Sequence, residues 1–176
     1  WIFAEDVVQT DPNTHHVVKA MNALDLLVVQ EIFMSETARM ADVVLPGTTF
    51  LEKSGTFTNT ERRVQQVNAA VKPLSGTKTD GQIIVEMMRK LGFDQPDYDA
   101  AEVLKEVASV VSFFEGITWE GLGASPTGLQ WPVNKKGEDT QILHIGEFKR
   151  GKGKFHYYDW RESEELVKHK NEYPFI

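Results

Sequence analysis

Histidines and carboxylates are the side chains whose types could support catalysis or metal binding. His15 and His16 are adjacent, but neighbouring residues of a helix point about 100° apart, so their imidazoles cannot share one metal ion. The carboxylates Glu31, Glu52 and Glu61 have no spacing that places two of them together locally, so the fold would have to assemble any acid–base pair. The sequence has no Gly-x-Gly-x-x-Gly, Walker or Gly-x-Ser-x-Gly motif. Spacing alone therefore predicts no catalytic centre.

Asp80 is a carboxylate with two interpretations. It opens a segment in which apolar residues recur at helical spacing and which Gly92 closes, so the helix dipole alone would favour an acid there. A carboxylate at this position can also accept two N–H hydrogen bonds from guanine, which presents adjacent donors at N1 and N2. A basic run, Lys149-Arg150-x-Lys152-x-Lys154, likewise fits either a solvated surface or contact with phosphate.

Two apolar runs, Leu26–Val29 and Val43–Leu45, predict buried strands of a parallel sheet because neither shows polar alternation. Polar or turn residues follow each run: Gln30-Glu31 after the first and Pro46-Gly47-Thr48-Thr49 after the second. Ligands of open α/β sheets sit at the carboxyl ends of the strands. We therefore expect a nucleotide-like ligand at this edge.

The neighbouring segments complete an α/β pattern. Residues 1–4 predict a strand, and Asp11-Pro12 predicts the start of a helix that ends near Asn22, so the first three elements form a βαβ unit. Ser35 predicts the cap of a short helix through Met40. We expect an extended loop from Thr48 that leads into a strand over Arg63–Val67.

The second half has fewer strong signals. Asp99 with Glu102 predicts a capping box for a helix that reaches Phe113 or Phe114. Beyond Gly116 the sequence predicts a β-hairpin or meander formed by two segments, Gln141–Ile145 and Lys154–Tyr158, around a hinge at residues 149–153. Residues 162–171 predict a charged, exposed loop or linker. The fold class is thus α/β, a Rossmann-like parallel sheet flanked by helices with a C-terminal β-hairpin and loop appendage.

Bulk composition fits a globular protein and excludes several partners. The 176 residues are 41% hydrophobic, carry a net charge of −7 and include no cysteine. This argues against a nucleic-acid partner and removes disulfides and thiolate metal ligands. No segment is apolar over the roughly 20 residues needed to span a bilayer, and no signal peptide is visible. Because the sequence begins and ends as if within strands, we expect it to be a piece of a longer polypeptide.

Two phrases, VVQEIFMSETARMADVVLP and GTFTNTERRVQ, resemble molybdopterin oxidoreductases of the dimethyl sulfoxide reductase superfamily, and most closely the catalytic alpha subunit of formate dehydrogenases. Weaker matches, in the same order as in the family, extend the resemblance over the chain: FAEDVVQTDP, KTDGQII, GLQWPV and the run from Gly151 to Phe155.

The resemblance implies a fragment of a large subunit that holds molybdenum or tungsten on two molybdopterin guanine dinucleotides and oxidises formate to carbon dioxide, passing two electrons to iron–sulfur centres. Residues 1–115 would be part of a Rossmann-like domain for one dinucleotide, and residues 116–176 the connection to a C-terminal β-barrel. The cofactor-binding residues implied are Asp6, Thr10, Gln30, Glu31, Ile32, Leu45, Gly47 and Asp80, with Asp80 at the guanine; Glu61 and Arg62 match a supporting motif.

The resemblance also places the metal-ligating cysteine or selenocysteine, the proton-handling histidine and the iron–sulfur cysteines outside these residues, so no catalytic or metal-binding residue is expected here. Expected partners are the rest of the subunit and iron–sulfur or electron-transfer subunits, with no membrane insertion and a cytoplasmic or periplasmic location. Ala4 departs from the family's usual Gly, and Val7 from its Pro. Two alternatives remain: the equivalent domain of a nitrate reductase or of the large complex I subunit, or a binding module without a nucleotide.

Overall fold

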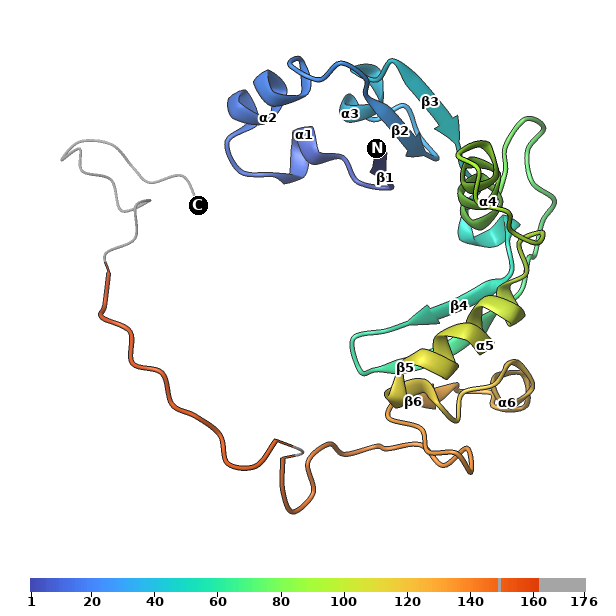
Figure 1. Ribbon diagram of the computed structural model, residues 1–176, viewed down its shortest axis with the longest axis vertical. Coiled ribbons are helices and arrows are strands. Elements are labelled where there is room, and N and C mark those ends of the chain that lie inside the picture. Colours follow the sequence, from blue (N-terminus) through green and yellow to red (C-terminus); the bar gives the residue numbers. More distant parts are fainter. Residues whose placement is uncertain (149, 162–176) are drawn as a thin grey trace. The chain divides into compact units, whose positions relative to one another are not determined.

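The computed structural model describes residues 1–148 and 150–161. The chain divides into two compact units, residues 1–141 and 142–176. The helices and strands of the described residues lie in the first unit (Figure 1). Their order is β1 (Ile2–Phe3), α1 (Val7–Thr10), α2 (Thr14–Met21), β2 (Val28–Glu31), α3 (Glu36–Arg39), β3 (Val43–Pro46), η1 (Phe50–Glu52), β4 (Gly55–Thr58), β5 (Arg63–Val67), α4 (Asp80–Lys90), α5 (Ala100–Val110), η2 (Ser112–Phe114), α6 (Trp119–Ala124) and β6 (Leu129–Gln130).

The predicted parallel sheet is confirmed. Its strand order is β1-β2-β3, and Gln30 lies beside Leu45 in the register of β2 with β3. Val29 is fully buried and packs with Met21, Leu27 and Ala38. Gln30 and Leu45 point to the other face, because successive residues of a strand alternate. That face also receives α4, as Gln30 bonds to the first residue of this helix.

β3 is less buried than its sequence predicts. Val43 is 42% exposed, and Val44 and Leu45 are only partly buried. The reason is that β3 pairs with β2 alone and forms an edge of the three-stranded sheet. A continuous apolar run does not distinguish a central strand from an edge strand that meets further surface elsewhere.

Capping residues define several of the helix starts, and the cap predicted at Ser35 is confirmed. Ser35 accepts a hydrogen bond from the Ala38 N–H, and Thr79 with Gln82 forms a capping box at α4. The helix predicted from Asp11-Pro12 instead begins at Thr14, because Asn13 adopts a left-handed conformation (φ 62°) and its side chain accepts from the His16 N–H. Asn tolerates this conformation better than most residues. The predicted helix therefore starts later, as α2, and a separate short helix, α1, precedes Asp11.

A second, antiparallel sheet has the order β4-β5-β6. The strand predicted at Arg63–Val67 is confirmed as β5, whereas the predicted extended loop before it contains the turn η1 and the strand β4. Five buried side chains form the core against this sheet: Val64, Leu104, Ile117, Leu122 and Val133. Gly128 is required beside it, since a Cβ there would lie 2.3 Å from the Val64 carbonyl oxygen at a φ of +80°.

Glu52 ties η1 to the segment before α4. One carboxylate oxygen accepts from the Thr49 N–H at 2.9 Å and the Thr49 hydroxyl at 3.0 Å, and the other accepts from the Leu74 N–H at 3.0 Å. The Thr49 N–H is the largest cause of a pKa that lies below the usual value of 4.5. These bonds hold the backbone that carries the next residue, Lys53.

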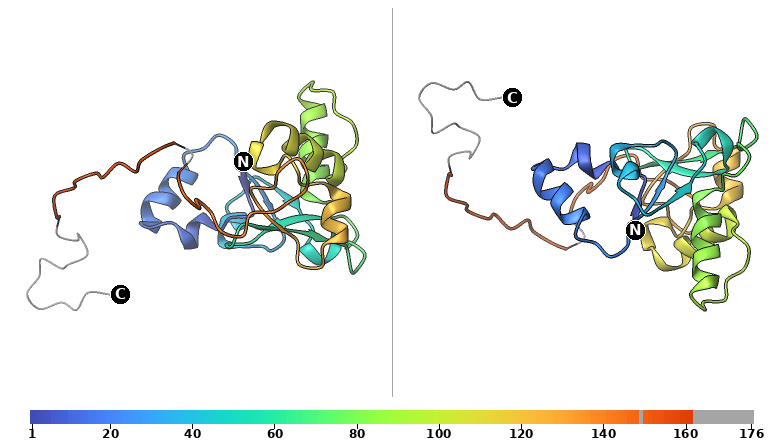
Figure 2. Two further views of the ribbon diagram at one scale, coloured as in Figure 1. Left: turned by 90° about the horizontal axis from the view of Figure 1, so that it is seen from below. Right: turned by 90° about the horizontal axis from the view of Figure 1, so that it is seen from above.

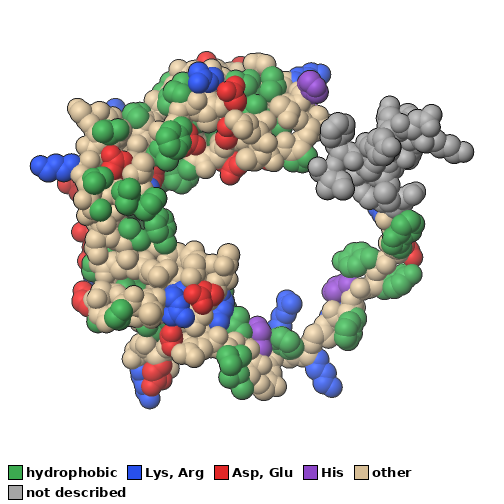
Figure 3. Space-filling model, turned by 180° about the vertical axis from the view of Figure 1, so that it is seen from behind, with side chains coloured by type: hydrophobic (Ala, Val, Ile, Leu, Met, Phe, Trp, Pro, Cys, Tyr) green, Lys and Arg blue, Asp and Glu red, His purple; other side chains and the backbone are tan. Residues whose placement is uncertain are grey.

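The predicted β-hairpin over Gln141–Ile145 and Lys154–Tyr158 is wrong: both segments lie in the described range and neither forms a strand. Apolar side chains of this region are almost fully exposed, including Ile145, Phe155 and Tyr157, and Figure 3 shows such side chains (green) along the extended trace drawn in Figure 2. Alternation produces a strand only where a partner strand or a surface buries one face.

Further sequence predictions have mixed outcomes. Asp99 caps α5 by accepting from the N–H groups of Ala101 and Glu102, but the Glu102 side chain pairs with Lys105 at 3.2 Å instead of closing the capping box. Lys149 of the basic run and residues 162–171 lie outside the described residues. The domain boundary after residue 115 stays a prediction. Across the described ranges, no helix has the length and apolarity needed to cross a bilayer.

We expect Leu122→Ala to reduce the free energy of unfolding by about 2–5 kcal/mol, because Leu122 is 2% exposed and its loss leaves a cavity against Val64. Leu74→Ala, at a side chain that is 72% exposed, is the control and should change stability by less than about 0.5 kcal/mol. Urea unfolding followed by circular dichroism measures both. Equal effects of the two substitutions would contradict the core assignment.

Glu52→Gln should change how stability depends on pH. Because the folded pKa of Glu52 lies below 4.5, the carboxylate contributes stability above the unfolded pKa and loses it as the pH falls through the folded pKa. The free energy of unfolding should therefore decrease less steeply below about pH 4.5 in the variant than in the wild type. Urea titrations over this range measure it, with Glu115→Gln as an exposed control. Parallel curves for wild type and Glu52→Gln would contradict the role of Glu52.

Candidate functional site at the carboxyl edge of the parallel sheet

The ends of β2 and β3 meet at Gly47. Its N–H donates to the Glu31 carbonyl at 3.1 Å. A Cβ on Gly47 would lie 3.2 Å from an Asp80 carboxylate oxygen and 3.7 Å from the Ile32 side chain. The fold thus brings four of the predicted cofactor-binding residues, Glu31, Ile32, Gly47 and Asp80, into one place. A side chain at position 47 would crowd the Asp80 carboxylate, so glycine suits this close approach.

The Asp80 carboxylate is the charged centre of this edge. Oδ1 accepts from the Gln30 amide N–H at 3.0 Å, and Oδ2 forms an ion pair with the Lys53 ammonium. Asp80 is the first residue of α4, where the helix dipole favours a negative charge. Its side chain is 23% exposed and that of Lys53 is 26% exposed, so the pair is shielded without being sealed from solvent.

Two buried polar atoms at the strand ends have no hydrogen-bond partner among the described residues. They are Oε1 of Gln30 and the hydroxyl oxygen of Thr48. Gln30 is 1% exposed, and its amide nitrogen already bonds to Asp80. A buried acceptor without a partner is costly. Its position beside the carboxylate therefore indicates a group that completes the hydrogen bonding from outside these residues.

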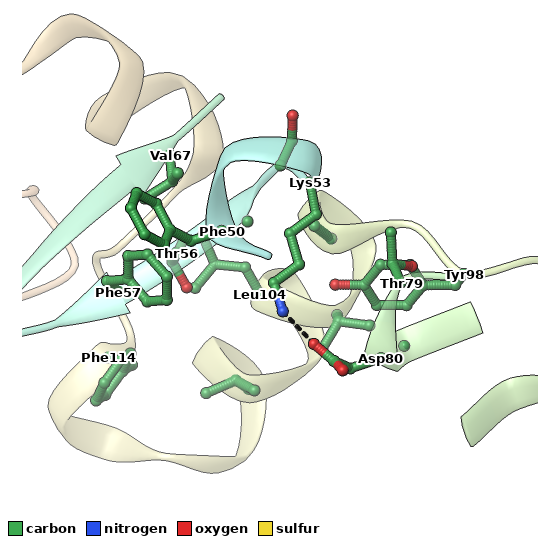
Figure 4. A pocket seen from close by; sticks show the side chains of 16 residues that line it. Phe50, Lys53, Thr56, Phe57, Val67, Thr79, Asp80, Tyr98, Leu104 and Phe114 are labelled. Atoms are coloured by element: carbon green, nitrogen blue, oxygen red, sulfur yellow. Dashed lines mark hydrogen bonds and ion pairs between the residues drawn. The ribbon is translucent and has the colours of Figure 1, made fainter. Parts of the chain in front are cut away.

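A cavity of about 290 Å³ opens next to Asp80 (Figure 4). Lys53, Thr79, Asp80 and Tyr98 form its polar end, and the apolar remainder includes Phe57 and Phe114. The Tyr98 ring lies against Gly81, where a Cβ would come within 2.1 Å of the ring. Burial, and secondarily the charge of Asp80, raises the pKa of the Tyr98 hydroxyl. The hydroxyl therefore stays protonated beside the carboxylate.

Asp6 and Thr10 lie after β1, and their side chains hydrogen-bond to residues other than Asp80. Asp6 accepts from the Thr37 N–H at 3.0 Å and the Thr37 hydroxyl at 2.6 Å, and that hydroxyl is the main reason that the pKa of Asp6 is lowered. Thr10 donates to Glu5 at 2.6 Å. Asp6 therefore fixes the loop after β1 to α3, whereas Thr10 is an exposed residue at the end of α1.

Ala4 occupies a strained backbone position in the loop after β1. Ala4 has a φ of 50°, in the left-handed region where a Cβ is unfavourable and glycine is not. Its N–H nevertheless donates to the Gln30 carbonyl at 2.9 Å. Ala4 therefore holds a backbone conformation that a glycine would adopt with less strain.

Leu45 and Glu31 use their side chains away from the Asp80 carboxylate. Leu45 lines a separate cavity of about 230 Å³ with Ile83 and Met87, and Glu31 accepts from the N–H of Ile32 at 2.7 Å. Among the described residues no three His, Asp or Glu side chains are grouped to hold a metal. His15 and His16 are exposed.

Lys53 and Tyr98 belong to the site but were not predicted from the sequence. Lys53 follows a stretch without helical or strand periodicity, and Tyr98 lies in the turn between two helices. Local patterns contain no signal for either, because their contacts with Asp80 and Gly81 depend on tertiary packing. Arg62, in contrast, supports backbone: its guanidinium donates to the carbonyls of Thr140 and Gln141 and lies over the Trp131 ring.

Comparison with known proteins identifies the family of this chain. The sequence profile of the family described as molybdopterin oxidoreductase matches residues 1–90. The chain is 41% identical to the F420-dependent formate dehydrogenase subunit alpha of Methanocaldococcus jannaschii, with 100% of this chain and 26% of the relative aligned. It is also 41% identical to the probable oxidoreductase YjgC of Bacillus subtilis, with 94% and 17% aligned. The chain thus spans about a quarter or less of these relatives.

The fold has a solved counterpart in the acetylene hydratase of Pelobacter acetylenicus. The match has a TM-score of 0.55 and 27% sequence identity, and it covers 67% of this chain and 16% of the hydratase. The sequence profile covers the whole parallel sheet, the strand ends at Gln30 and Gly47, and α4 from Asp80 onward. This chain belongs to the molybdopterin oxidoreductase family.

Proposed function

We propose that this chain forms part of the guanine dinucleotide site of a molybdopterin-dependent formate dehydrogenase. The family implies a molybdopterin cofactor; the dinucleotide form is our inference. The observation that carries the proposal is the unpartnered, buried Oε1 of Gln30 beside the Asp80 carboxylate at the carboxyl edge of the sheet. This is the edge at which open α/β sheets bind nucleotides.

The residues at the edge fit a guanine base. Guanine presents N1–H and N2–H donors side by side, and the two Asp80 oxygens can each accept one more hydrogen bond, because a carboxylate has about four acceptor sites. Gln30 offers its free carbonyl oxygen to the second N2 proton. Gly47 leaves the approach open. In this assignment Asp80 and Gln30 bind the base.

The other predicted residues would position the rest of the dinucleotide. Asp6 and Thr10 follow β1, and Glu31, Ile32 and Leu45 flank the ends of β2 and β3. Asp6 would act by holding its loop through Thr37. When bound, the molybdopterin with molybdenum or tungsten would supply two-electron redox chemistry. The chain itself has no cysteine to ligate a metal, so we expect it not to oxidise formate alone.

Formate as the parent substrate is supported by relatives that are named formate dehydrogenases, at 40% identity or more. Partners would be the remaining parts of the subunit and an electron-transfer subunit. A second candidate is the equivalent domain of another superfamily member. It is favoured by the structural match to a hydratase, whose name describes a different reaction.

Asp80→Asn should change the base that the site prefers from guanine to xanthine. An amide can accept from N1–H and donate to the 2-carbonyl of xanthine, but it cannot accept from both donors of guanine. We expect affinity for GDP to fall roughly 5- to 150-fold, the range of one bidentate base contact, and affinity for xanthosine diphosphate to rise. Titrations of the chain at up to millimolar nucleotide, followed by heteronuclear NMR, measure both.

Asp97→Asn is the matched control for this exchange. Asp97 also pairs with a basic side chain, Arg89 at 2.8 Å, but its own side chain is 96% exposed and lies outside the site. It should leave both affinities unchanged. An Asp80→Asn chain that binds GDP as tightly as the wild type, or a folded wild type that does not bind GDP at all, would refute the guanine assignment.

A further inference from the structure

Lys53 occupies the position next to the base-binding carboxylate. Its ammonium pairs with Oδ2 of Asp80, whereas the Gln30 amide bonds to Oδ1. Figure 4 shows the Lys53 side chain extending across the polar end of the cavity toward Asp80. The groups therefore follow one another in the order ammonium, Oδ2, Oδ1. This is a donor followed by two acceptors.

The edge of guanine has the complementary order. O6 is an acceptor, N1–H a donor and N2–H a donor, so N1–H and N2–H at the two Asp80 oxygens bring O6 to the side of Lys53. Adenine has a donor amino group at position 6 and an acceptor at N1, which would oppose the ammonium and the carboxylate respectively. The sequence of groups therefore discriminates between the two purines.

We propose that Lys53 donates a hydrogen bond to O6 of guanine and is a specificity-determining residue of this site. The inference rests on the proposed guanine site. Lys53 need not release Asp80, because an ammonium has three donors and can serve Oδ2 and O6 together. Its backbone is held by the hydrogen bonds of the preceding residue, Glu52, to Thr49 and Leu74. The Lys53 side chain is only 26% exposed, so little water competes with O6 for the ammonium's N–H donors.

A purely structural ion pair is the alternative, and a sulfur analogue separates the two. 6-Thio-GDP keeps N1–H and the 2-amino group but replaces O6 by a poorer acceptor. At slightly acidic pH, where both bases keep the N1 proton, wild-type chain should bind GDP about tenfold more tightly than 6-thio-GDP, as for one charge-assisted hydrogen bond. Equal affinities in the wild type would overturn the proposal without any variant.

Lys53→Met should weaken the binding of GDP about tenfold and make the affinities for GDP and 6-thio-GDP equal. Lys53→Arg, which retains a charged donor, should restore part of the preference for GDP. Inosine diphosphate, which keeps O6 but lacks the 2-amino group, should lose affinity relative to GDP by the same factor in wild type and Lys53→Met. That ratio reports on the contacts of the 2-amino group with Asp80 and Gln30, and not on Lys53.

Lys78→Met is the matched control. Lys78 precedes α4 and pairs at 2.6 Å with Glu86, which lies in α4 as Asp80 does. Neither Lys78 nor Glu86 lines the cavity next to Asp80. The control substitution should leave all three affinities unchanged. If the wild type binds GDP and Asp80→Asn switches to xanthine, but Lys53→Met keeps the wild-type ratio of GDP to 6-thio-GDP, only the Lys53 inference fails. If the folded wild type binds no GDP, the proposed function itself fails.

Discussion

The Asp80 carboxylate joins three segments that are distant in sequence. It receives the Gln30 amide from the end of β2 and the Lys53 ammonium from the turn after η1, and it begins α4 itself. A partly buried charge is tolerated only when such partners compensate its lost hydration. Removal of the carboxylate would leave both the amide and the ammonium without their partner. The arrangement of these side chains at the strand edge therefore depends on the Asp80 carboxylate.

The interactions that build the edge also leave it able to bind. Gln30 donates to Asp80 but keeps a buried, unpartnered oxygen, and Gly47 adds no side chain where β3 passes the carboxylate. On the β1 side, the Asp6 carboxylate accepts hydrogen bonds from Thr37, so Asp6 supports the loop after β1. The predicted site residues thus divide into groups with free acceptors and groups whose hydrogen bonds hold backbone.

Features that depend on local chemistry were predictable from the sequence. The caps at Ser35, Thr79 and Asp99 and the strands β2 and β3 follow from residues within a few positions of each other. Features that depend on what a segment packs against were not. The hairpin expected at residues 141–158 lacks a buried face, and the cap of α2 moved to Asn13 because its backbone adopts a left-handed turn. Lys53 acquires its role only when tertiary packing places it at Asp80, and no periodic pattern encodes that.

The comparisons separate what this domain contributes from what a parent enzyme does. One matching structure is named for the hydration of acetylene, and relatives at 41% identity are named for formate dehydrogenation. Proteins named for such different reactions share this fold, so the common element is better explained by cofactor binding than by attack on a substrate. Selection on its edge would then act on recognition of a base, and the order of groups from Lys53 through Asp80 to Gln30 is where that recognition would be decided.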